Sequence, residues 1–215
     1  MSRHATCAKS RKQTGLLGSV GLALLLLLSA PAVADDYADC NATDELLKTD
    51  PGRAVAACGR LAERGNVIAQ YNLGLMYFAG QGVARDHAQA AKWFRKAAEQ
   101  GDGPAQYNLG LLYEEGQGAQ RDLVEAAMWY RKAAEQGYVY AQDKLGFMYG
   151  AGEGVPTDLV QSYLWLSLAA AAGDADASAY RAFIEAGMTQ EQITEARRLV
   201  DQWKPEKAGD SLFGY

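Results

Sequence analysis

The stretch Ala69-Gln70-Tyr71-Asn72-Leu73-Gly74-Leu75 returns twice further along the chain. It reappears as Ala105-Gln106-Tyr107-Asn108-Leu109-Gly110-Leu111 and, more loosely, as Ala141-Gln142-Asp143-Lys144-Leu145-Gly146-Phe147. The starting positions 69, 105 and 141 lie 36 residues apart, and a fixed period of this length is typical of stacked structural repeats. Other landmarks keep the same period: Tyr77, Tyr113 and Tyr149; Gly82, Gly118 and Gly154; Trp93, Trp129 and Trp165; Gly101, Gly137 and Gly173.

Each repeat is predicted to hold two helices, and the first of them carries the quoted stretch. In the first repeat, Ala69, Leu73, Met76 and Tyr77 follow helical spacing and line one face. Gly74 lies inside this helix, where glycine costs about 1 kcal/mol relative to alanine. We therefore expect a gain in return, namely a close approach of the paired helix at this position, with no side chain between the two backbones. Gly80-Gln81-Gly82 is predicted to end the helix, because glycine adopts positive φ without strain.

The second helix of each repeat is predicted to begin at an aspartate. Asp86, Asp122 and Asp158 are followed three residues later by Gln or Glu, a pattern that resembles a capping box and suits the positive end of the helix dipole. The last glycines of the periodic set are predicted to end these helices. In the first repeat the expected buried stripe of this helix is Ala90, Trp93, Phe94, Ala97 and Ala98.

These signals divide the chain into segments. Residues 66–101, 102–137 and 138–173 are predicted to form the three repeats. Residues 35–65 are predicted to be a degenerate N-terminal capping repeat, because their second half keeps the apolar spacing whereas their first half lacks the Leu-Gly and Gly-x-Gly marks. Residues 174–215 are predicted to form C-terminal capping helices and a tail.

Two helices are expected in this C-terminal segment. The first runs from Asp174 to Ala186 and ends near Gly187. The second opens with a capping box at Thr189 and Gln192 and is expected to end at Pro205, since proline cannot continue a helix.

Residues 1–34 have the parts of a secretory signal peptide. Basic residues come first, an apolar run from Leu16 to Leu28 follows, and Ala32-Val33-Ala34 supplies the small residues that a signal peptidase reads. We predict cleavage after Ala34 and a periplasmic or secreted protein without stable membrane insertion. The alternative is an uncleaved membrane anchor, but the apolar run is shorter than the roughly 20 residues that span a bilayer.

Cleavage would leave a strongly acidic chain. The whole chain has 21 Lys and Arg against 26 Asp and Glu, and residues 1–34 hold four of the basic residues and none of the acidic ones. The remaining 17 basic and 26 acidic residues give a net charge of −9. Such a surface repels the nucleic acid backbone and anionic lipid, so no nucleic acid partner is expected. The charge also has a simpler role, which is to keep an exported protein soluble.

Two cysteines, Cys40 and Cys58, follow the predicted cleavage site. In an exported chain such a pair is a candidate disulfide. A helix that begins at Asp50-Pro51 and folds back on the preceding segment would bring them face to face, and the bond would add on the order of 3 kcal/mol to stability. The alternative is a pair of buried free thiols.

The complete repeat pattern resembles the Sel1-like repeat, a relative of the tetratricopeptide repeat. The pattern A-x-x-x-L-G-x-x-Y-x-x-G-x-G-x-x-x-D-x-x-x-A-x-x-W-[FY]-x-x-A-A-x-x-G runs from Ala69 to Gly101 and from Ala105 to Gly137. The third copy, from Ala141 to Gly173, is looser and has Tyr163 where the first two copies have Ala91 and Ala127. The resemblance implies an all-α fold, a right-handed α-solenoid of helix-turn-helix repeats with a concave face. It also implies a role in protein interactions, as a scaffold or adaptor.

The chain after residue 34 carries few groups suited to catalysis. Its one histidine, His87, is expected to be an exposed residue at a helix start rather than a ligand or triad member. No H-E-x-x-H, C-x-x-C, G-x-S-x-G or S-x-x-K motif occurs there, so we expect no cofactor, no metal site and no enzymatic activity. Trp93, Trp129 and Trp165 are candidates for a sugar or aromatic-ligand platform, but their strict spacing among alanines favours core packing.

By analogy with tetratricopeptide arrays, the first helices of the repeats are expected to line the concave face. Aromatic, aliphatic and amide side chains there suit an extended or helical peptide. Some of these residues are also common in such repeats, so packing and capping are their alternative roles. The predicted partner-binding residues are Tyr71, Asn72, Leu75 and Phe78 in the first repeat, Tyr107, Asn108, Leu111 and Glu114 in the second, and Lys144 and Phe147 in the third.

We therefore predict a non-catalytic exported scaffold that binds protein or peptide partners in the cell envelope, in signalling or assembly. The alternative is a hydrolase of cell-envelope or β-lactam compounds, because some Sel1-like relatives are described as β-lactamase-like or penicillin-binding. Those relatives carry disulfides inside successive repeats, whereas no cysteine follows Gly65 here. A third hypothesis is a structural envelope component that works by self-assembly.

Overall fold

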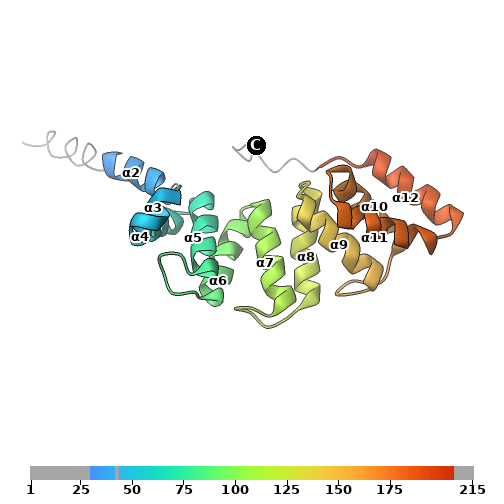
Figure 1. Ribbon diagram of the computed structural model, residues 1–215, viewed down its shortest axis with the longest axis horizontal. Coiled ribbons are helices and arrows are strands. Elements are labelled where there is room, and N and C mark those ends of the chain that lie inside the picture. Colours follow the sequence, from blue (N-terminus) through green and yellow to red (C-terminus); the bar gives the residue numbers. More distant parts are fainter. Residues whose placement is uncertain (1–29, 42–43, 206–215) are drawn as a thin grey trace, which may run out of the picture. The chain divides into compact units, whose positions relative to one another are not determined.

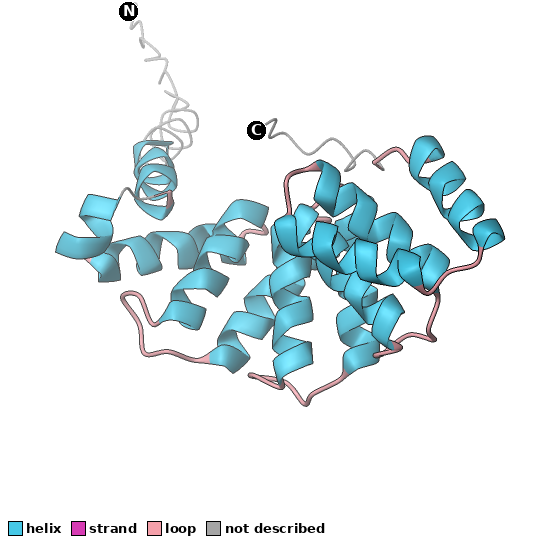
Figure 2. Cartoon of the chain, turned by 45° about the vertical axis from the view of Figure 1, so that its right-hand side comes forward, coloured by secondary structure: helices cyan, strands magenta, loops and turns pink. Residues whose placement is uncertain are grey.

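The computed structural model describes residues 30–41 and 44–205 of the 215-residue chain. Every regular element in these residues is a helix, as Figures 1 and 2 show. The chain divides into two compact units, residues 1–35 and 36–215, and the repeats lie in the second unit. The prediction of an all-α fold is therefore confirmed.

The helices of the second unit form two alternating sets, which we call A helices and B helices. The first three A helices each pack on the B helix that follows, and each B helix packs on the next A helix. This stacking of helix pairs is an α-solenoid, as predicted. The A helices are α5 (Val67–Ala79), α7 (Gly103–Glu115), α9 (Val139–Ala151) and α11 (Ala175–Ala186), and the B helices are α4 (Pro51–Glu63), α6 (His87–Glu99), α8 (Leu123–Glu135) and α10 (Leu159–Ala171).

The B helices of the repeats begin at the predicted aspartates. Asp86, Asp122 and Asp158 are N-caps, and their carboxylates accept hydrogen bonds from backbone N–H groups two and three residues on, at 2.9–3.1 Å. At these three helix starts, the described hydrogen bonds run from backbone N–H groups to the aspartate carboxylate. The reciprocal bond from the cap's backbone N–H to the Gln or Glu side chain is not among them, so only half of the predicted capping box is formed. The full box forms at Thr189, whose N–H donates to Gln192 Oε1 at 2.9 Å while Gln192 N–H donates to its hydroxyl at 3.3 Å.

Gly74 and its equivalents allow close contact between the two helices of a pair. A Cβ atom at Gly74 would lie 2.6 Å from Cδ1 of Phe94, and one at Gly110 would lie 2.6 Å from Cε1 of Tyr130. Both rings belong to the paired B helix and are fully buried. The close approach is confirmed, but it differs from the expected one, because a side chain of the B helix rests on the glycine instead of the two backbones meeting.

A second set of glycines seats each loop against the preceding repeat. Gly118 follows α7 with a φ of 70°, and a Cβ atom there would lie 2.1 Å from the carbonyl oxygen of His87 at the start of α6. Gly154 stands in the same relation to the carbonyl oxygen of Leu123, also at 2.1 Å. The Gly-x-Gly joints therefore do more than end the A helices, because their second glycine also lets neighbouring repeats dock backbone to backbone.

Buried glutamines also connect successive repeats. Gln106 Nε2 on α7 donates to the carbonyl oxygen of Ala98 on α6 at 3.1 Å, and its Oε1 accepts from Gln136 Nε2, beyond the end of α8, at 2.8 Å. Gln100 and Gln70 are joined in the same way one repeat earlier, at 2.7 Å. Both polar ends of the Gln106 amide are satisfied, as a buried amide requires. These hydrogen bonds hold the repeats in a single register.

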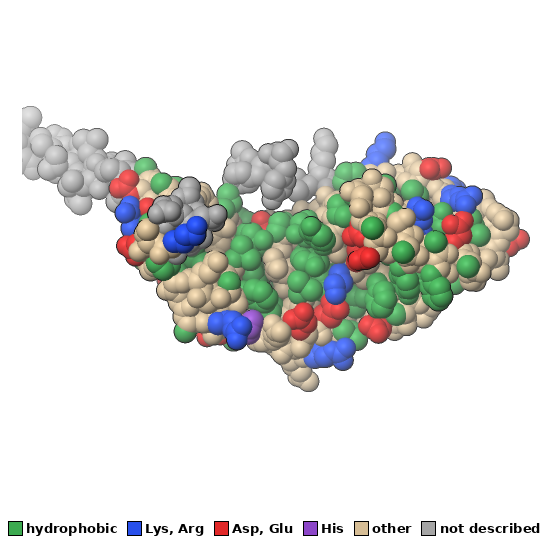
Figure 3. Space-filling view, viewed as in Figure 1, with side chains coloured by type: hydrophobic (Ala, Val, Ile, Leu, Met, Phe, Trp, Pro, Cys, Tyr) green, Lys and Arg blue, Asp and Glu red, His purple; other side chains and the backbone are tan. Residues whose placement is uncertain are grey.

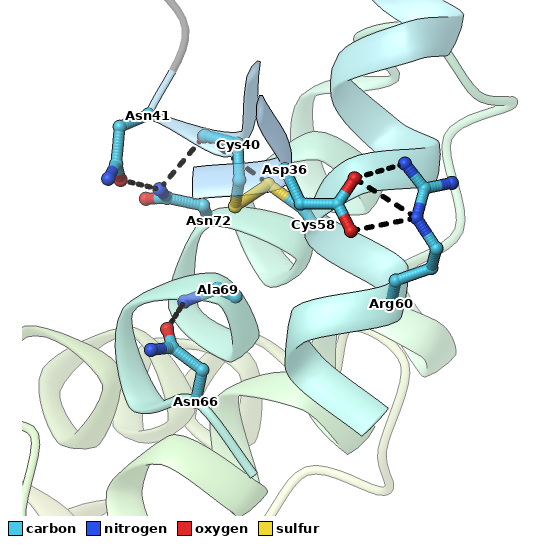
Figure 4. Close-up of a disulfide and its surroundings, with 8 residues drawn as sticks. All are labelled: Asp36, Cys40, Asn41, Cys58, Arg60, Asn66, Ala69 and Asn72. Carbon is cyan, nitrogen blue, oxygen red and sulfur yellow. Dashed lines mark hydrogen bonds and ion pairs between the residues drawn. A yellow bond between two sulfur atoms is a disulfide. The ribbon is translucent and has the colours of Figure 1, made fainter. Parts of the chain in front are cut away.

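The start of the second unit is tied down by a disulfide (Figure 4). Cys40, at the end of α2 (Ala30–Cys40), is bonded to Cys58 on α4, and their Cα atoms lie 4.6 Å apart. Nearby, the Asp36 carboxylate accepts hydrogen bonds from Arg60 Nε at 3.1 and 3.0 Å. The predicted disulfide is therefore present, and the alternative of two free thiols is not. The short helix α3 (Asp44–Thr49) connects α2 to α4.

The C-terminal end is closed by α12 (Gln190–Gln202), which packs on α10. Its Leu199 and Val200, together with Trp203, contact the core cluster that contains Trp165. The helix ends before Trp203, slightly earlier than the predicted end at Pro205. The preceding helix α11 ends at Ala186, as predicted, and occupies the place of a fourth A helix.

The predicted signal peptide lies largely outside the described residues, which begin at residue 30. Helix α2 runs without a break through the predicted cleavage site after Ala34. Among the described helices, none combines the length and apolar character needed to span a bilayer. The disulfide is typical of proteins from oxidising compartments and is consistent with export. The predicted tail, residues 206–215, also lies outside the described part of the chain.

Candidate functional site

The predicted partner-binding residues lie on one side of α5, α7 and α9, and the same positions continue onto α11; we call this side the A-helix face. Figure 3 shows hydrophobic side chains gathered over α5, α7 and α9, with acidic and basic side chains between them. Among the predicted residues, Phe147 is exposed and the others are half-buried. Four positions recur on the face with the repeat period: Tyr71, Tyr107 and Asp143; Asn72, Asn108, Lys144 and Tyr180; Leu75, Leu111, Phe147 and Phe183; Phe78, Glu114, Gly150 and Ala186.

The two asparagines of the predicted set take part in the fold. Asn72 Nδ2 donates to the carbonyl oxygen of Cys40 at 3.2 Å, which joins α5 to the disulfide-bonded cap (Figure 4). Asn108 Nδ2 donates to the carbonyl oxygen of Pro104 in its own helix at 3.0 Å. These contacts fit the alternative role, packing and capping, that the sequence left open for them.

The remaining residues of the first repeat pack into the core cluster between the first and second repeats. Tyr71, Leu75 and Phe78 all border this cluster. The Tyr71 ring lies 5.9 Å from the Phe94 ring, centroid to centroid, and the Phe78 ring meets the His87 ring edge-on at 5.1 Å. This end of the A-helix face is therefore largely filled by its own side chains.

An ion pair joins the second and third repeats on the A-helix face. Lys144 Nζ on α9 lies 3.0 Å from Oε1 and 3.1 Å from Oε2 of Glu114 on α7. The hydroxyl of Tyr130, which reaches the face from α8, donates to the same carboxylate. Burial and this hydrogen bond raise the pKa of Tyr130 far above its usual range. Glu114 and Lys144 therefore neutralise each other, and they bridge the repeats.

A group of tyrosines gathers around Tyr107, next to Glu114 of this ion pair. The Tyr107 ring lies 5.3 Å from the Tyr138 ring, 5.7 Å from the Tyr130 ring and 6.1 Å from the Tyr140 ring, measured between centroids. Burial, with smaller contributions from Tyr138 and Glu114, raises the pKa of Tyr107 to about 12. Tyr140 keeps 60% of its surface exposed. Tyrosine in such groups offers a rigid apolar ring together with a hydroxyl, which suits peptide contacts.

A second aromatic group lies across α9 and α11. The Phe147 ring lies 5.0 Å from the Tyr180 ring, and the Tyr180 ring stacks on Phe183 at 5.9 Å. Phe183 is 72% exposed, an unusual position for a phenylalanine. Beside it lies a cavity of about 380 Å³, lined by apolar groups that include Leu159 and Ile184. This end of the A-helix face therefore combines exposed rings with a recess.

Sequence reasoning missed five residues of the face: Tyr138, Tyr140, Asp143, Tyr180 and Phe183. Tyr180 and Phe183 were within reach, because they lie 36 residues after Lys144 and Phe147, which were predicted. The C-terminal segment was interpreted as a cap, so the period was not carried into α11. Tyr138 and Tyr140 follow no repeat position that the first two units mark, and only the packing brings them beside Tyr107.

The other candidate groups in the sequence were a histidine, three tryptophans and possible metal ligands. His87 was expected to be exposed, but it is half-buried against Phe78, and its Nδ1 has no hydrogen-bond partner among the described residues. Trp93, Trp129 and Trp165 are at most 7% exposed, so core packing is confirmed for them. Within residues 30–41 and 44–205, no group of three His, Cys, Asp or Glu side chains is arranged to hold a metal ion.

Comparison with protein families assigns these repeats. The Sel1 repeat matches residues 67–102, 103–138 and 139–174, which together make up half of the chain. The chain belongs to the Sel1 repeat family, as its pattern of Leu-Gly, Gly-x-Gly and Trp positions indicated. The comparison with curated proteins found no match.

Solved structures of Sel1 repeat proteins share the fold. A Sel1 repeat protein from Oxalobacter formigenes is 39% identical over 61% of this chain and 38% of its own, with a TM-score of 0.57. The protein c5321, a protective antigen present in uropathogenic Escherichia coli strains, is 31% identical over 74% of this chain and 42% of its own, with a TM-score of 0.55. This chain thus spans less than half of either relative. Helicobacter pylori cysteine rich protein B, 24% identical over 62% of this chain and 96% of its own with a TM-score of 0.50, shares the fold alone.

Proposed function

We propose that this chain is an exported, non-catalytic scaffold that binds a protein or peptide partner through the A-helix face. The observation that carries the proposal is a row of exposed rings on adjacent A helices, with Tyr140 60%, Phe147 45% and Phe183 72% exposed. Exposed aromatic side chains that lie next to one another on a surface commonly mark an interaction site. The solenoid supports the rings rigidly, so little ordering of the site is needed on binding.

Export is the second part of the proposal. The sequence of residues 1–34 supports it, as does the disulfide between Cys40 and Cys58. The relative c5321 is described as a protective antigen. No observation favours the alternative of a cell-envelope or β-lactam hydrolase. Expression in a bacterium, fractionation and N-terminal sequencing test export: the expected product is periplasmic or secreted and begins at Asp35, and a cytoplasmic full-length chain would refute this part.

Site-specific crosslinking tests the binding face. A photoreactive phenylalanine analogue at Phe147 should crosslink a defined partner in cells of the source organism. The matched control carries the same analogue at Met128, which is 39% exposed on α8, a B helix. Recovery of the same partner from both positions, or from neither, would count against the A-helix face.

Substitution then measures what the rings contribute. Tyr140→Ala and Phe147→Ala should each weaken binding of the crosslinked partner by about tenfold, the usual effect of truncating an aromatic anchor. Val124→Ala, at a 65% exposed apolar position on α8, serves as the control and should leave binding unchanged. Circular dichroism checks that every variant keeps its helices.

A further inference from the structure

The C-terminal part of the A-helix face carries two parallel rows of acidic and aromatic side chains. On α9 the row is Tyr140, Asp143 and Phe147, and on α11 it is Asp176, Tyr180 and Phe183. Spacings of three and four residues place each row on one side of its helix. The 5.0 Å contact between the Phe147 and Tyr180 rings joins the two rows. We call these six residues the acidic–aromatic strip.

The charges of the strip are of one sign. Asp143 is half-buried, and burial together with the nearby carboxylates of Asp174 and Asp176 raises its pKa. The cation beside it, Lys144, partly offsets this effect, but its ammonium group is held by Glu114 at 3.0 Å. The strip therefore presents negative potential that the described part of the chain does not neutralise, which favours a cationic partner.

The apolar part of the strip borders the cavity of about 380 Å³. Gly150 on α9 lines one part of it, and Tyr180, Phe183 and Ile184 on α11 line another. Its volume and its apolar lining leave room for one large apolar side chain. A partner can therefore place a ring or aliphatic chain here and a cation at the neighbouring carboxylates.

We propose that the acidic–aromatic strip binds a peptide segment in which a basic residue lies two positions from a large apolar residue. The inference rests on the proposed function and specifies the partner of the same face. Asp143 and Phe147 are one helical turn apart, a rise of roughly 6 Å. Side chains two positions apart in an extended peptide lie on one side of it and are separated by roughly 6.6 Å. The two spacings match, so an extended segment can pair its cation with Asp143 while its apolar group contacts Phe147.

Three fluorescent peptides test the specificity. The probe alternates arginine and phenylalanine at every second position, with glycine and serine between them. One matched peptide has glutamate in place of arginine, and the other has alanine in place of phenylalanine. Fluorescence anisotropy with the purified protein should give at least tenfold weaker binding for both matched peptides. Affinity for the probe should also fall as NaCl rises from about 0.05 to about 0.5 M, because salt screens exposed charges.

Two double variants test whether the probe peptide binds at the acidic–aromatic strip. The double substitution Asp143→Asn with Asp176→Asn should lower the affinity for the probe peptide about fivefold, the order expected for exposed ion pairs. The control, Glu99→Gln with Asp201→Asn, removes the same charge from exposed positions on α6 and α12 and should change affinity less than twofold. The first pair is not expected to unfold the protein, because the fold disfavours the charge of Asp143. Circular dichroism verifies this.

The outcomes separate the inference from the proposed function. Equal or tighter binding of the glutamate peptide, or equal losses in the two double variants, overturns the inference. The proposed function survives that result if Phe183→Ala still lowers the affinity for the tightest-binding peptide about tenfold. If neither Phe183→Ala nor Phe147→Ala alters the binding of any peptide, both the inference and the proposed function fall.

Discussion

At the scale of single residues, Gly118 carries two constraints at once. Its φ of 70° lies in the left-handed region, which costs other residues about 1–2 kcal/mol. A Cβ atom would also lie 2.1 Å from the carbonyl oxygen of His87, so the loop would have to move away from the preceding repeat. We expect Gly118→Ala to lower the free energy of unfolding by about 3 kcal/mol or more, as measured by urea unfolding.

Gly101→Ala is the matched control for this prediction. Gly101 also has positive φ, at 94°, but nothing lies within 4 Å of the position its Cβ would take. Its substitution should therefore cost only the backbone strain, about 1–2 kcal/mol. Equal losses at the two glycines would show that docking of the loop contributes nothing.

A second prediction for a single residue concerns Asp36 and the loss of its stabilising effect at low pH. The hydrogen bonds from Arg60 hold the pKa of Asp36 below its ordinary value of 3.8, with further help from the charge of Arg64. A lowered folded-state pKa means that the ionised group stabilises the fold above pH 3.8, and this stabilisation is lost as pH falls through the folded-state pKa. The melting temperature of Asp36→Asn should lie below that of the wild type at neutral pH, and the gap should close below about pH 3.8.

Asp143 should behave in the opposite way. Burial and the carboxylates of Asp174 and Asp176 raise its pKa despite Lys144, so its charge destabilises the fold above the folded-state pKa. Asp143→Asn should therefore melt higher than the wild type at neutral pH, and this advantage should vanish as pH falls below 3.8. Melting curves at several pH values test both signs, and a lower melting temperature for Asp143→Asn at neutral pH would contradict the prediction.

At the scale of elements, the disulfide holds the end of α2 on α4. It closes a loop between positions 18 residues apart, which stabilises a fold by about 3 kcal/mol. Cys40→Ala with Cys58→Ala should therefore speed hydrogen exchange in α4 and at the start of α5, where Asn72 contacts the Cys40 carbonyl oxygen. Exchange measured by mass spectrometry should remain unchanged in α9, which packs between α8 and α10. A uniform loss of protection would mean that the disulfide stabilises the whole array instead of its first helices.

At the scale of the whole molecule, α12 determines how the array ends. In a stacked array each repeat depends on its neighbours, so an uncovered last pair weakens the others. Leu199 packs against the core cluster that contains Trp165, and a charge there would remain without a partner. We expect Leu199→Asp to cost about 2–3 kcal/mol and to lower the melting temperature of the array as a whole. Thr194→Asp, on an exposed position of the same helix, should leave the melting temperature nearly unchanged.

Much of the fold could be predicted because its signals are local. The aspartate caps and the glycine stops repeat with one period and depend on residues within a single helix pair. The tryptophans keep the same period, although Trp129 and Trp165 pack against the preceding repeat. The close approach at Gly74 was also predictable, since a glycine inside a helix requires a reason. The sequence did not show which group lies against Gly74, and the structure shows that it is the Phe94 ring.

The candidate site was less predictable, because its contacts join separate repeats. The period alone placed Glu114 and Lys144 on the A-helix face, but their pairing across 30 positions depends on how α7 and α9 stack. The tyrosines at 138 and 140 gain their neighbours in the same way.

Local sequence patterns were thus sufficient for the helix pairs, their ends and the residues that face inward, because backbone capping and side-chain periodicity act within a few turns. The packing between repeats, the position of α12 on α10, and the gathering of rings and carboxylates into one strip emerged only in the folded chain. They depend on distances between residues that are remote in sequence, and a period does not specify those distances.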